Sequence, residues 1–247
     1  MPISKLLNKT VLITGSAVRI GKEITLAFAE RGANLIIHYN KSELKAEELK
    51  AELIKKNIKA FTIQADFRQS RQYESFIDEC LEKAGSLDIL VNNASVFPKI
   101  SLNDLTLTDL MTDMEINTWA PFALSRAFAG KVKSGSIINM LDQRITSYDW
   151  THTGYILSKH VLTVLTKMSA LAFAPSIRVN GIAPGLILPP PGEPVSYIEN
   201  LAPTVPLKKH GDPKDVAEAA VFLAECDYVT GDVIFVDGGR HLKEYAA

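Results

Sequence analysis

Tyr155 and Lys159 carry the clearest signal of acid–base chemistry in this chain, because they are four positions apart. On a helix this spacing places both side chains on one face. A free phenol has a pKa of about 10 and is a poor proton carrier near neutral pH. An ammonium group within a few ångströms favours the phenolate, which would make Tyr155 a better acid–base catalyst. The pair is common by itself, so its meaning depends on the elements that position it.

Short β-branched runs alternate with longer amphipathic segments along almost the whole chain. The predicted strands are Val11–Thr14, Asn34–His38, Ala60–Gln64, Ile89–Asn92, Ser136–Met140, Arg178–Ile182 and Val233–Val236. The predicted helices lie near 21–31, 43–56, 70–84, 106–130, 155–173 and 213–225. Continuous apolar strands between helices predict an α/β fold, with a doubly wound parallel sheet of about seven strands and helices on both faces. Such a sheet binds ligands at the carboxyl ends of its strands, and Tyr155 follows the fifth strand.

Composition limits the functions that remain. The chain has 27 Lys and Arg against 28 Asp and Glu, which argues against a protein that binds nucleic acid through its phosphates. Cys80 and Cys226 form no C-x-x-C motif and the five histidines have no metal-ligand spacing, so we expect no metal site. No apolar run reaches about 18 residues and the N-terminus lacks a secretory pattern. We therefore expect a soluble cytoplasmic protein that does not bind membranes.

The first predicted strand leads into a helix through a turn that contains Gly15, Arg19, Ile20 and Gly21. A pyrophosphate needs close approach of the backbone, with helix N–H groups and the helix dipole directed at the anion. The two glycines suit both the tight turn and the close contact between helix and strand. Two glycines six apart also fit a purely structural turn, but their place at the first strand–helix junction favours a dinucleotide.

The ends of the next three strands extend this nucleotide site. After the second strand the chain reads His38, Tyr39, Asn40, Lys41 and Ser42, with no acid that would accept a hydrogen bond from a free ribose 2′-hydroxyl. A lysine and a hydroxyl suit a 2′-phosphate and favour NADPH over NADH, unless Lys41 is simply a solvated loop residue. Asp66 either accepts from an adenine amino group or caps the helix expected near Ser70. Asn92, Asn93 and Ala94 predict a polar floor beneath the cofactor ribose.

In their order along the chain, these motifs resemble those of the short-chain dehydrogenase/reductase family. The matching segments are Thr14-Gly15…Gly21, Asn92-Asn93-Ala94, Asn117, Tyr155-x-x-x-Lys159, Pro184-Gly185 and Asp237-Gly238-Gly239. The resemblance covers nearly the whole length and implies one Rossmann-type domain over residues 1–247. It also implies a nicotinamide cofactor, hydride transfer with Tyr155 as acid or base, and a homotetramer or homodimer. By the same resemblance, Asn117 supports a proton-relay water chain and Pro184-Gly185 borders the nicotinamide.

Two positions depart from that family's usual pattern. Arg19 stands where the turn normally has a third glycine, and Asp142, thirteen residues before Tyr155, stands where many members have a catalytic serine. A serine hydroxyl donates a hydrogen bond to a carbonyl, whereas an ionised aspartate only accepts. The change favours a substrate with N–H groups, or with a ring nitrogen that needs a relayed proton. Other roles are open: Asp142 as the cap of a turn, and Arg19 as the partner of a surface carboxylate.

Both departures occur together in the pteridine reductases, which the chain resembles closely. The shared segments are Arg19, His38-Tyr39-Asn40-Lys41-Ser42, Asn93-Ala94-Ser95-Val96-Phe97, and the set of Asp142, Tyr155 and Lys159. The resemblance implies NADPH-dependent reduction of a dihydropterin, or of dihydrofolate, to the tetrahydro form. The pterin would stack between the nicotinamide and Phe97. Ser95 and Arg19 would bind the pterin or the cofactor phosphates, while Asp142 and Tyr155 would pass a proton to the ring nitrogen.

The segment 184–213 is rich in proline and has no helical periodicity, so we expect an irregular excursion with a substrate lid at about 186–212. Trp150 and His152 either face the substrate or pack within a loop. Taken alone, Phe97 would be an ordinary core or lid residue.

Two other functions stay open. One is a reductase of another carbonyl substrate, such as a 3-oxoacyl thioester. The other is a non-catalytic NADP-binding regulator, against which the intact set of Asn117, Tyr155 and Lys159 argues.

Overall fold

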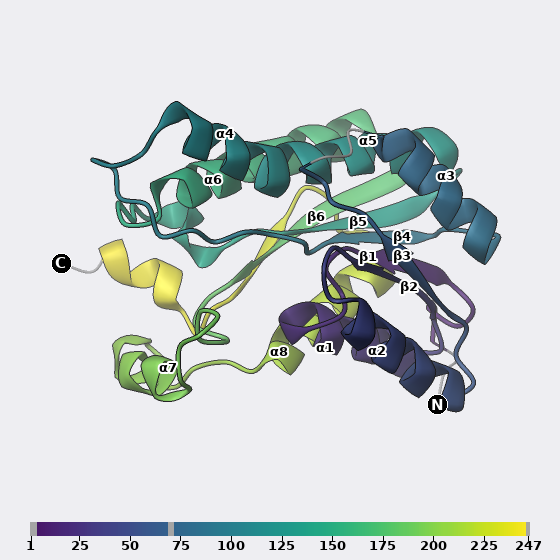
Figure 1. Ribbon diagram of the computed structural model, residues 1–247, viewed down its shortest axis with the longest axis horizontal. Coiled ribbons are helices and arrows are strands. Elements are labelled where there is room, and N and C mark those ends of the chain that lie inside the picture. Colours follow the sequence, from purple (N-terminus) through teal and green to yellow (C-terminus); the bar gives the residue numbers. More distant parts are fainter. Residues whose placement is uncertain (1–3, 69–71, 246–247) are drawn as a thin grey trace.

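Seven parallel strands form one sheet in the order β3-β2-β1-β4-β5-β6-β7 (Figure 1). This computed structural model describes residues 4–68 and 72–245. The strands are β1 (Thr10–Ile13), β2 (Asn34–Tyr39), β3 (Ala60–Gln64), β4 (Ile89–Asn92), β5 (Gly135–Met140), β6 (Ile177–Pro184) and β7 (Val233–Val236). The strand order reverses between β1 and β4, which is the place where a doubly wound sheet opens a crevice for a ligand. The predicted parallel α/β fold is confirmed.

Helices cover both faces of the sheet. In Figure 1, α3, α4, α5 and α6 lie on one face and α1, α2 and α8 on the other, with α7 beyond the sheet. Their bounds are α1 (Arg19–Glu30), α2 (Glu43–Lys55), α3 (Tyr73–Ala84), α4 (Leu107–Met114), α5 (Ala120–Lys131), α6 (Thr153–Ala172), α7 (Ser196–Leu201) and α8 (Pro213–Glu225).

Two predicted elements differ from the structure. The helix expected over 106–130 is interrupted by a π-helical segment, Glu115–Trp119, between α4 and α5. The segment 184–213 is not irregular throughout, because it contains α7 and a short 3-10 turn. Pro194 lies before α7, and Pro203 lies in the first turn of the following 3-10 helix, where proline is tolerated. The prolines of this segment therefore do not exclude a short helix between them. The expected start of the third helix, near residue 70, lies outside the described residues.

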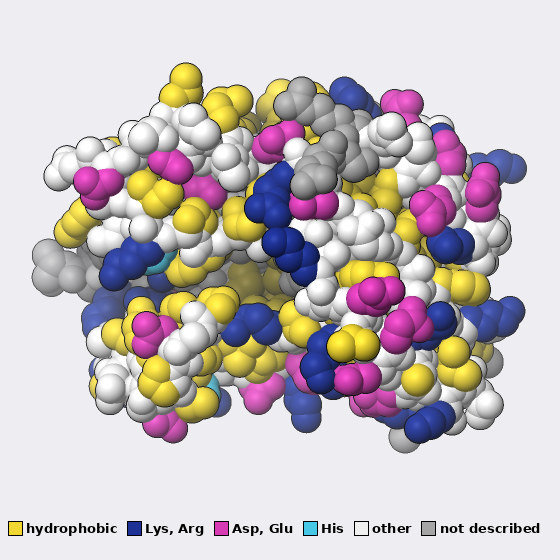
Figure 2. Space-filling model, viewed as in Figure 1, with side chains coloured by type: hydrophobic (Ala, Val, Ile, Leu, Met, Phe, Trp, Pro, Cys, Tyr) yellow, Lys and Arg dark blue, Asp and Glu magenta, His cyan; other side chains and the backbone are white. Residues whose placement is uncertain are grey.

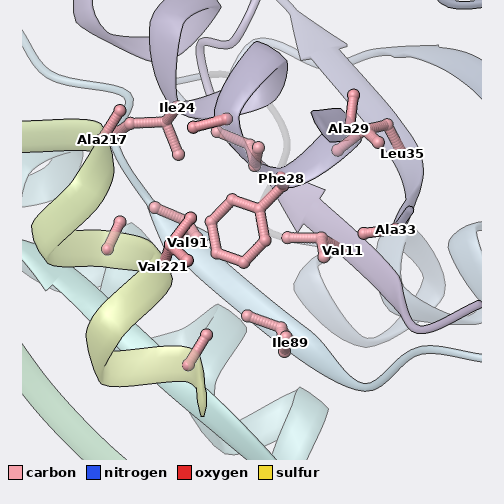
Figure 3. Close-up of a cluster of buried hydrophobic side chains, with 14 of the residues drawn as sticks. Val11, Ile24, Phe28, Ala29, Ala33, Leu35, Ile89, Val91, Ala217 and Val221 are labelled. Atoms are coloured by element: carbon pink, nitrogen blue, oxygen red, sulfur yellow. The ribbon is translucent and has the colours of Figure 1, made fainter. Parts of the chain in front are cut away.

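Both faces of the sheet are buried, which explains why the strands are apolar without alternation. Val11 and Ile13 belong to the core beneath α1 and α8, whereas Leu12 belongs to the core on the opposite face. Phe28 of α1 lies within the first core and is fully buried, with Val91 of β4 close to its ring (Figure 3). Packing on both faces holds the carboxyl ends of the strands in a fixed register.

The described part of the chain contains neither a membrane-spanning helix nor a metal-binding cluster. No helix there is long and apolar enough to cross a membrane. No group of three or more His, Cys, Asp or Glu side chains among residues 4–68 and 72–245 is arranged to hold a metal ion. Cys80 and Cys226 are both free thiols.

Replacing Phe28 with alanine tests the core. The side chain is 0% exposed, so its loss removes burial and leaves a cavity. We expect the free energy of unfolding to fall by about 3–5 kcal/mol in chemical denaturation. Leu44→Ala on α2, where the side chain is 80% exposed, is the control and should change stability by no more than about 0.5 kcal/mol. Equal losses in the two variants would contradict this description of the core.

Candidate active site

A cleft of about 850 Å³ lies at the carboxyl edge of the sheet. Figure 2 shows the molecule hollowed near the middle of the visible face, with hydrophobic side chains at the base and Lys and Arg side chains around it. Most residues named from the sequence line this cleft: Gly15, Arg19, Ile20, Gly21, His38, Tyr39, Asn40, Lys41, Ser42, Asp66, Asn93, Ala94, Ser95, Phe97, Asp142, Tyr155 and Gly185. Asn117, Lys159 and Pro184 lie outside its lining.

The turn after β1 leaves no room for side chains at its glycines. Gly15 has φ +63°, and a Cβ at Gly21 would overlap the Gly15 carbonyl oxygen and lie 2.7 Å from Asn93 Nδ2. Arg19 also has a positive φ, 55°, at the first residue of α1. Val18 precedes it and provides no side-chain cap for the helix. The first N–H groups of α1 therefore have no capping side chain, which suits an anionic ligand.

His38 supports this turn from beneath. Its Nδ1 accepts a hydrogen bond from the Gly15 N–H at 3.0 Å, so its Nε2 carries the hydrogen that points to the Ala65 carbonyl at 3.1 Å. Burial lowers the pKa of His38 to about 4, against the opposing effect of the bond to Ala65. The ring also stacks on Phe67. His38 is thus neutral near pH 7 and positions the turn without adding a positive charge.

Lys41 and Arg68 bring positive charge to the end of the cleft near β2 and β3. Lys41 is exposed and forms no ion pair in the described part of the chain. The Arg68 guanidinium lies 3.3 Å from the carboxylate of Asp66, which also accepts from the Arg68 N–H at 3.0 Å. Arg68 was not predicted from the sequence, although its place just after β3 is a signal that could have identified it.

The asparagine pair after β4 divides into two roles. Asn93 Nδ2 donates to the carbonyls of Thr14 and Gly15 at 2.9 and 3.0 Å, and so ties this loop to the turn. Asn92 is buried, does not line the cleft, and donates to Asn139 Oδ1 at 2.8 Å. Asn93 and Ala94 line the cleft, whereas Asn92 faces inward from the strand and cannot belong to the predicted floor.

Asn117 lies in the π-helical segment and is fully buried. Its Oδ1 accepts hydrogen bonds from Ser95 Oγ at 2.8 Å and from the Val96 N–H at 2.9 Å, while its Nδ2 donates to the Val96 carbonyl. Short π segments occur frequently at functional sites. Here the segment directs one amide at the loop that carries Ser95 into the cleft.

Asp142 and Tyr155 meet at the carboxyl end of β5. The Tyr155 hydroxyl donates to Asp142 Oδ2 at 2.8 Å, and the other oxygen, Oδ1, accepts from the Arg144 N–H at 2.9 Å. Asp142 thus caps the 3-10 helix η2 (Gln143–Thr146) and binds the phenol at the same time. The two roles considered for this residue do not exclude each other.

The electrostatics of Tyr155 differ from the sequence expectation. Burial and the neighbouring Asp142 raise the pKa of Tyr155 well above its usual value. Lys159 donates to the Met140 carbonyl at 2.7 Å, and its Nζ lies 5.7 Å from the centre of the Tyr155 ring. Burial lowers the pKa of Lys159 to about 8, although Asp142 favours the charged form. The expected shift towards phenolate is wrong for this arrangement, in which Tyr155 keeps its proton.

Phe97 is surrounded by polar rings and charges. His152 stacks on it with ring centres 4.1 Å apart, the Arg144 guanidinium lies 5.3 Å from its centre, and Tyr155 meets it edge-on at 4.6 Å. His152 lines the cleft, whereas Trp150 does not line it and is 70% exposed. Of the two residues left open from the sequence, the structure brings only His152 into the site. Arg144 was not predicted.

A family model described as enoyl-(acyl carrier protein) reductase matches residues 15–241. The oxidoreductase UcpA of Escherichia coli O157:H7 is 35% identical, covering 98% of each chain. The 3-oxoacyl-[acyl-carrier-protein] reductase FabG of Staphylococcus epidermidis is 30% identical, covering 96% of this chain and all of the relative. The chain belongs to the short-chain dehydrogenase/reductase family. It is therefore an oxidoreductase of a family that uses NAD(P).

Two solved structures of this family are also similar. One is FolM alternative dihydrofolate reductase 1 from Brucella canis complexed with NADP, 30% identical, with a TM-score of 0.89 over 96% of each chain. The other is the same protein from Brucella suis with NADP, 29% identical, with a TM-score of 0.91 over 96% of each chain. These similarities support the resemblance to pteridine reductases within the short-chain dehydrogenase/reductase family.

The residues present fit a dinucleotide cofactor of this family. The packed glycines, the uncapped start of α1 and the neutral His38 leave backbone N–H groups free for a pyrophosphate. Lys41 and Arg68 add positive charge at the far end of the same cleft. The turn therefore has both the shape and the charge that the family's cofactor needs.

The start of α6, which carries Tyr155, packs against a buried carboxyl group in this member of the family. Asp113 of α4 is 2% exposed, and its Oδ2 has no hydrogen-bond partner among the described residues. A Cβ at Gly154 would overlap this oxygen, so α4 and α6 approach closely only because residue 154 is glycine. Burial, assisted by Asp109, raises the pKa of Asp113 to about 6.

Asp113→Asn tests the cost of that buried carboxylate. The folded protein binds the Asp113 proton more tightly than the unfolded chain, so stability decreases as pH rises from about 4 through 6. The unfolding free energy of the variant minus that of wild type should therefore increase by up to about 3 kcal/mol from pH 4 to pH 7. Urea denaturation at both pH values measures this, with Asp104→Asn as the exposed control. A difference that does not change with pH would contradict the assignment.

Proposed function

We propose that this protein is an NADPH-dependent reductase that converts a dihydropterin, or dihydrofolate, to its tetrahydro form. The proposal depends on one observation, the 2.8 Å hydrogen bond from the Tyr155 hydroxyl to Asp142. An ionised carboxylate beside the reacting group accepts hydrogen bonds from ring N–H groups but cannot donate to a ketone oxygen. The names and the bound NADP of the two Brucella structures support the same substrate class and cofactor.

The cofactor would be held along the nucleotide end of the cleft. The proposed residues are Gly15, Arg19, Ile20, Gly21, His38, Tyr39, Asn40, Lys41, Ser42, Asp66, Asn93, Ala94, Tyr155, Lys159, Pro184 and Gly185. Lys41 would bind the 2′-phosphate, and Arg68, which lines the same end, is a second candidate for it. Arg19 donates to the Pro189 carbonyl at 2.6 Å and so reaches from the phosphate turn to the proposed lid.

The proton chemistry follows from the contacts of Tyr155. When bound, NADPH supplies the hydride for the ring carbon. Tyr155 would donate its hydroxyl proton to the adjacent ring nitrogen, and Lys159, protonated near neutral pH, would stabilise the resulting phenolate. Asp142 would orient the hydroxyl and return a proton to it from solvent. Asn117 would fix the loop that holds Ser95 and would support a proton-relay water chain.

The substrate ring would lie against Ser95 and Phe97. An aromatic heterocycle gains about 1 kcal/mol from offset stacking in addition to burial. His152 already covers one face of the Phe97 ring, so the substrate ring would stack on the other face. Arg19, Asp142 and Tyr155 would supply the polar contacts.

A second function has one observation in its favour. The relative named as a 3-oxoacyl reductase is 30% identical over its whole length, so reduction of a 3-oxoacyl thioester is the alternative. A non-catalytic NADP-binding regulator is a further alternative, but such a protein has no chemical need for a phenol, an ammonium and a carboxylate grouped at one site.

We also propose that the chain forms a homodimer or a homotetramer. A stripe of hydrophobic side chains on α6 remains exposed, formed by Leu157, Val161, Val164, Met168 and Leu171. Their spacing places them on one side of the helix. A contiguous apolar stripe on a single chain is typical of a surface that another chain covers.

Asp142→Ser separates the two substrate classes. We expect kcat/KM for 7,8-dihydrobiopterin to fall at least about 100-fold, because the proton path is lost, while turnover of acetoacetyl-CoA rises. NADPH oxidation by purified protein measures both, and Asp104→Ser controls for loss of a surface carboxyl. Unchanged dihydropterin turnover would remove Asp142 from the mechanism. Tight NADPH binding by wild type without turnover of any substrate would favour the regulator.

Lys41→Glu tests the cofactor preference. Loss of one charged contact to the 2′-phosphate, with added repulsion, should lower the ratio of kcat/KM with NADPH to that with NADH by about 10- to 100-fold. Lys45→Glu, on α2 and outside the cleft lining, is the matched control. An unchanged ratio would show that another group, such as Arg68, holds the phosphate.

A further inference from the structure

Two arginines line the cleft at the end that holds Asp142 and Tyr155. Arg144 belongs to η2, and Arg240 begins the 3-10 helix η4 (Arg240–Tyr245). These two short helices pack against each other, and Thr146 Oγ1 donates to the His241 carbonyl at 3.5 Å. Residues almost a hundred positions apart thus place two guanidinium groups at one end of the cleft.

Arg144 is held in place but has spare hydrogen-bonding capacity. One of its guanidinium nitrogens lies 3.5 Å from Asp149 Oδ2 as an ion pair, yet this buried nitrogen makes no hydrogen bond among the described residues. Asp149 also binds His152 Nδ1 at 3.0 Å and the Thr151 N–H at 2.8 Å. Burial raises the pKa of Asp149, but these hydrogen bonds and Arg144 outweigh it and hold the pKa below its usual value. One carboxylate is therefore shared by two basic side chains.

Arg240 has no acidic partner in the part of the chain that the structure describes. The nearest carboxylate along the chain, Asp237, is already occupied. It accepts from the Gly239 N–H at 2.9 Å, and from the His241 N–H and Nδ1 at 2.6 and 2.8 Å. Arg240 therefore lines the cleft with a positive charge that is unpaired among the described residues.

Neither arginine is used by the chemistry proposed above. The groups that would bind the cofactor phosphates, Arg19, Lys41 and Arg68, come from the turn after β1 and the ends of β2 and β3. A neutral dihydropterin would leave Arg240 with no anionic partner, whereas Arg144 already has Asp149. Arg144 Nη1 is buried beside Asp149, so a ligand in the cleft would meet the other N–H groups of this guanidinium and those of Arg240.

We propose that Arg144 and Arg240 form a subsite for an anionic group at the end of the substrate, and that this group is the carboxylate tail of dihydrofolate. The inference rests on the proposed function and narrows its substrate class from dihydropterins in general to those that carry a carboxylate tail. Planar guanidinium groups bind carboxylates with paired, charge-assisted hydrogen bonds. The phosphates of an acyl-CoA thioester have related chemistry, so the experiment includes such a substrate.

The test compares substrates with and without the tail. The protein is assayed with 7,8-dihydrofolate, with the uncharged 7,8-dihydrobiopterin and with acetoacetyl-CoA, as wild type, Arg144→Gln, Arg240→Gln and the double variant. Lys243→Gln is the matched control, because Lys243 lies on η4 but donates to the Thr204 carbonyl and does not line the cleft. Thermal unfolding of each variant shows whether it is folded.

We expect each arginine variant to lower the ratio of kcat/KM for dihydrofolate to that for dihydrobiopterin by about tenfold, mainly through KM. Lys243→Gln should leave the ratio unchanged. In wild type, KM for dihydrofolate should rise with ionic strength, and this dependence should weaken in the double variant.

Other outcomes overturn the inference in distinguishable ways. If dihydropterins are reduced but the ratio is the same in all variants, the proposed function stands and the carboxylate subsite is wrong. If only KM for acetoacetyl-CoA responds to the arginines, the anion is a phosphate and the carboxylate assignment fails. If wild type reduces neither pterin, the proposed function fails. In that case, quenching of protein fluorescence still measures whether dihydrofolate binding depends on Arg144 and Arg240, and independence from them overturns the subsite as well.

Discussion

A phenol, an ammonium and a carboxylate share one largely buried volume at the end of β5, and the rest of the structure has to hold them there. Tyr155 is 7% exposed and Lys159 is 3% exposed. Burial of such groups costs free energy unless each one finds a partner. Tyr155 finds Asp142, and Lys159 finds the Met140 carbonyl. The site therefore exists only as long as β5 and α6 keep their separation and register.

Packing around α6 supplies that constraint. Its inner face buries Leu162 against Ala183 of β6 and against Leu141, which directly follows β5. Its first turn lies against Asp113, close enough that only glycine fits at position 154. Asp113 is a buried carboxyl without a hydrogen bond to Oδ2, so this contact costs stability rather than adding to it. Strain and unsatisfied groups of this kind are tolerated near functional sites when the surrounding packing over-determines them.

The sequence predicted the fold well because the physical signals for it are local. Apolar strands, helical periodicity and glycines at the first turn each follow from neighbouring residues, and the strand-end rule then placed Asp142 and Tyr155 together. The π-helical segment was missed because five residues are too few to change a periodicity. Arg144, His152 and Arg240 gain their meaning from the packing of η2 on η4 and from the ring of Phe97, which no local pattern shows. The predicted shift of the Tyr155 pKa was wrong because the burial of Tyr155 and the position of Lys159 relative to its ring are tertiary features.

The order of charges along the cleft links these observations. Lys41 and Arg68 follow β2 and β3 at the nucleotide end of the cleft, whereas Arg144 and Arg240 line the end that holds the carboxylate of Asp142. These charges are complementary to a cofactor and a substrate that together carry negative charge at both ends and N–H groups near Asp142. A phosphate-bearing cofactor supplies the negative charge at the nucleotide end, and a nitrogen heterocycle supplies the N–H groups. A neutral heterocycle would leave Arg240 without a counter-charge, whereas a carboxylate on its far side completes the match. The same order disfavours a long acyl chain, because its apolar body would have to desolvate Asp142 without offering a hydrogen-bond donor.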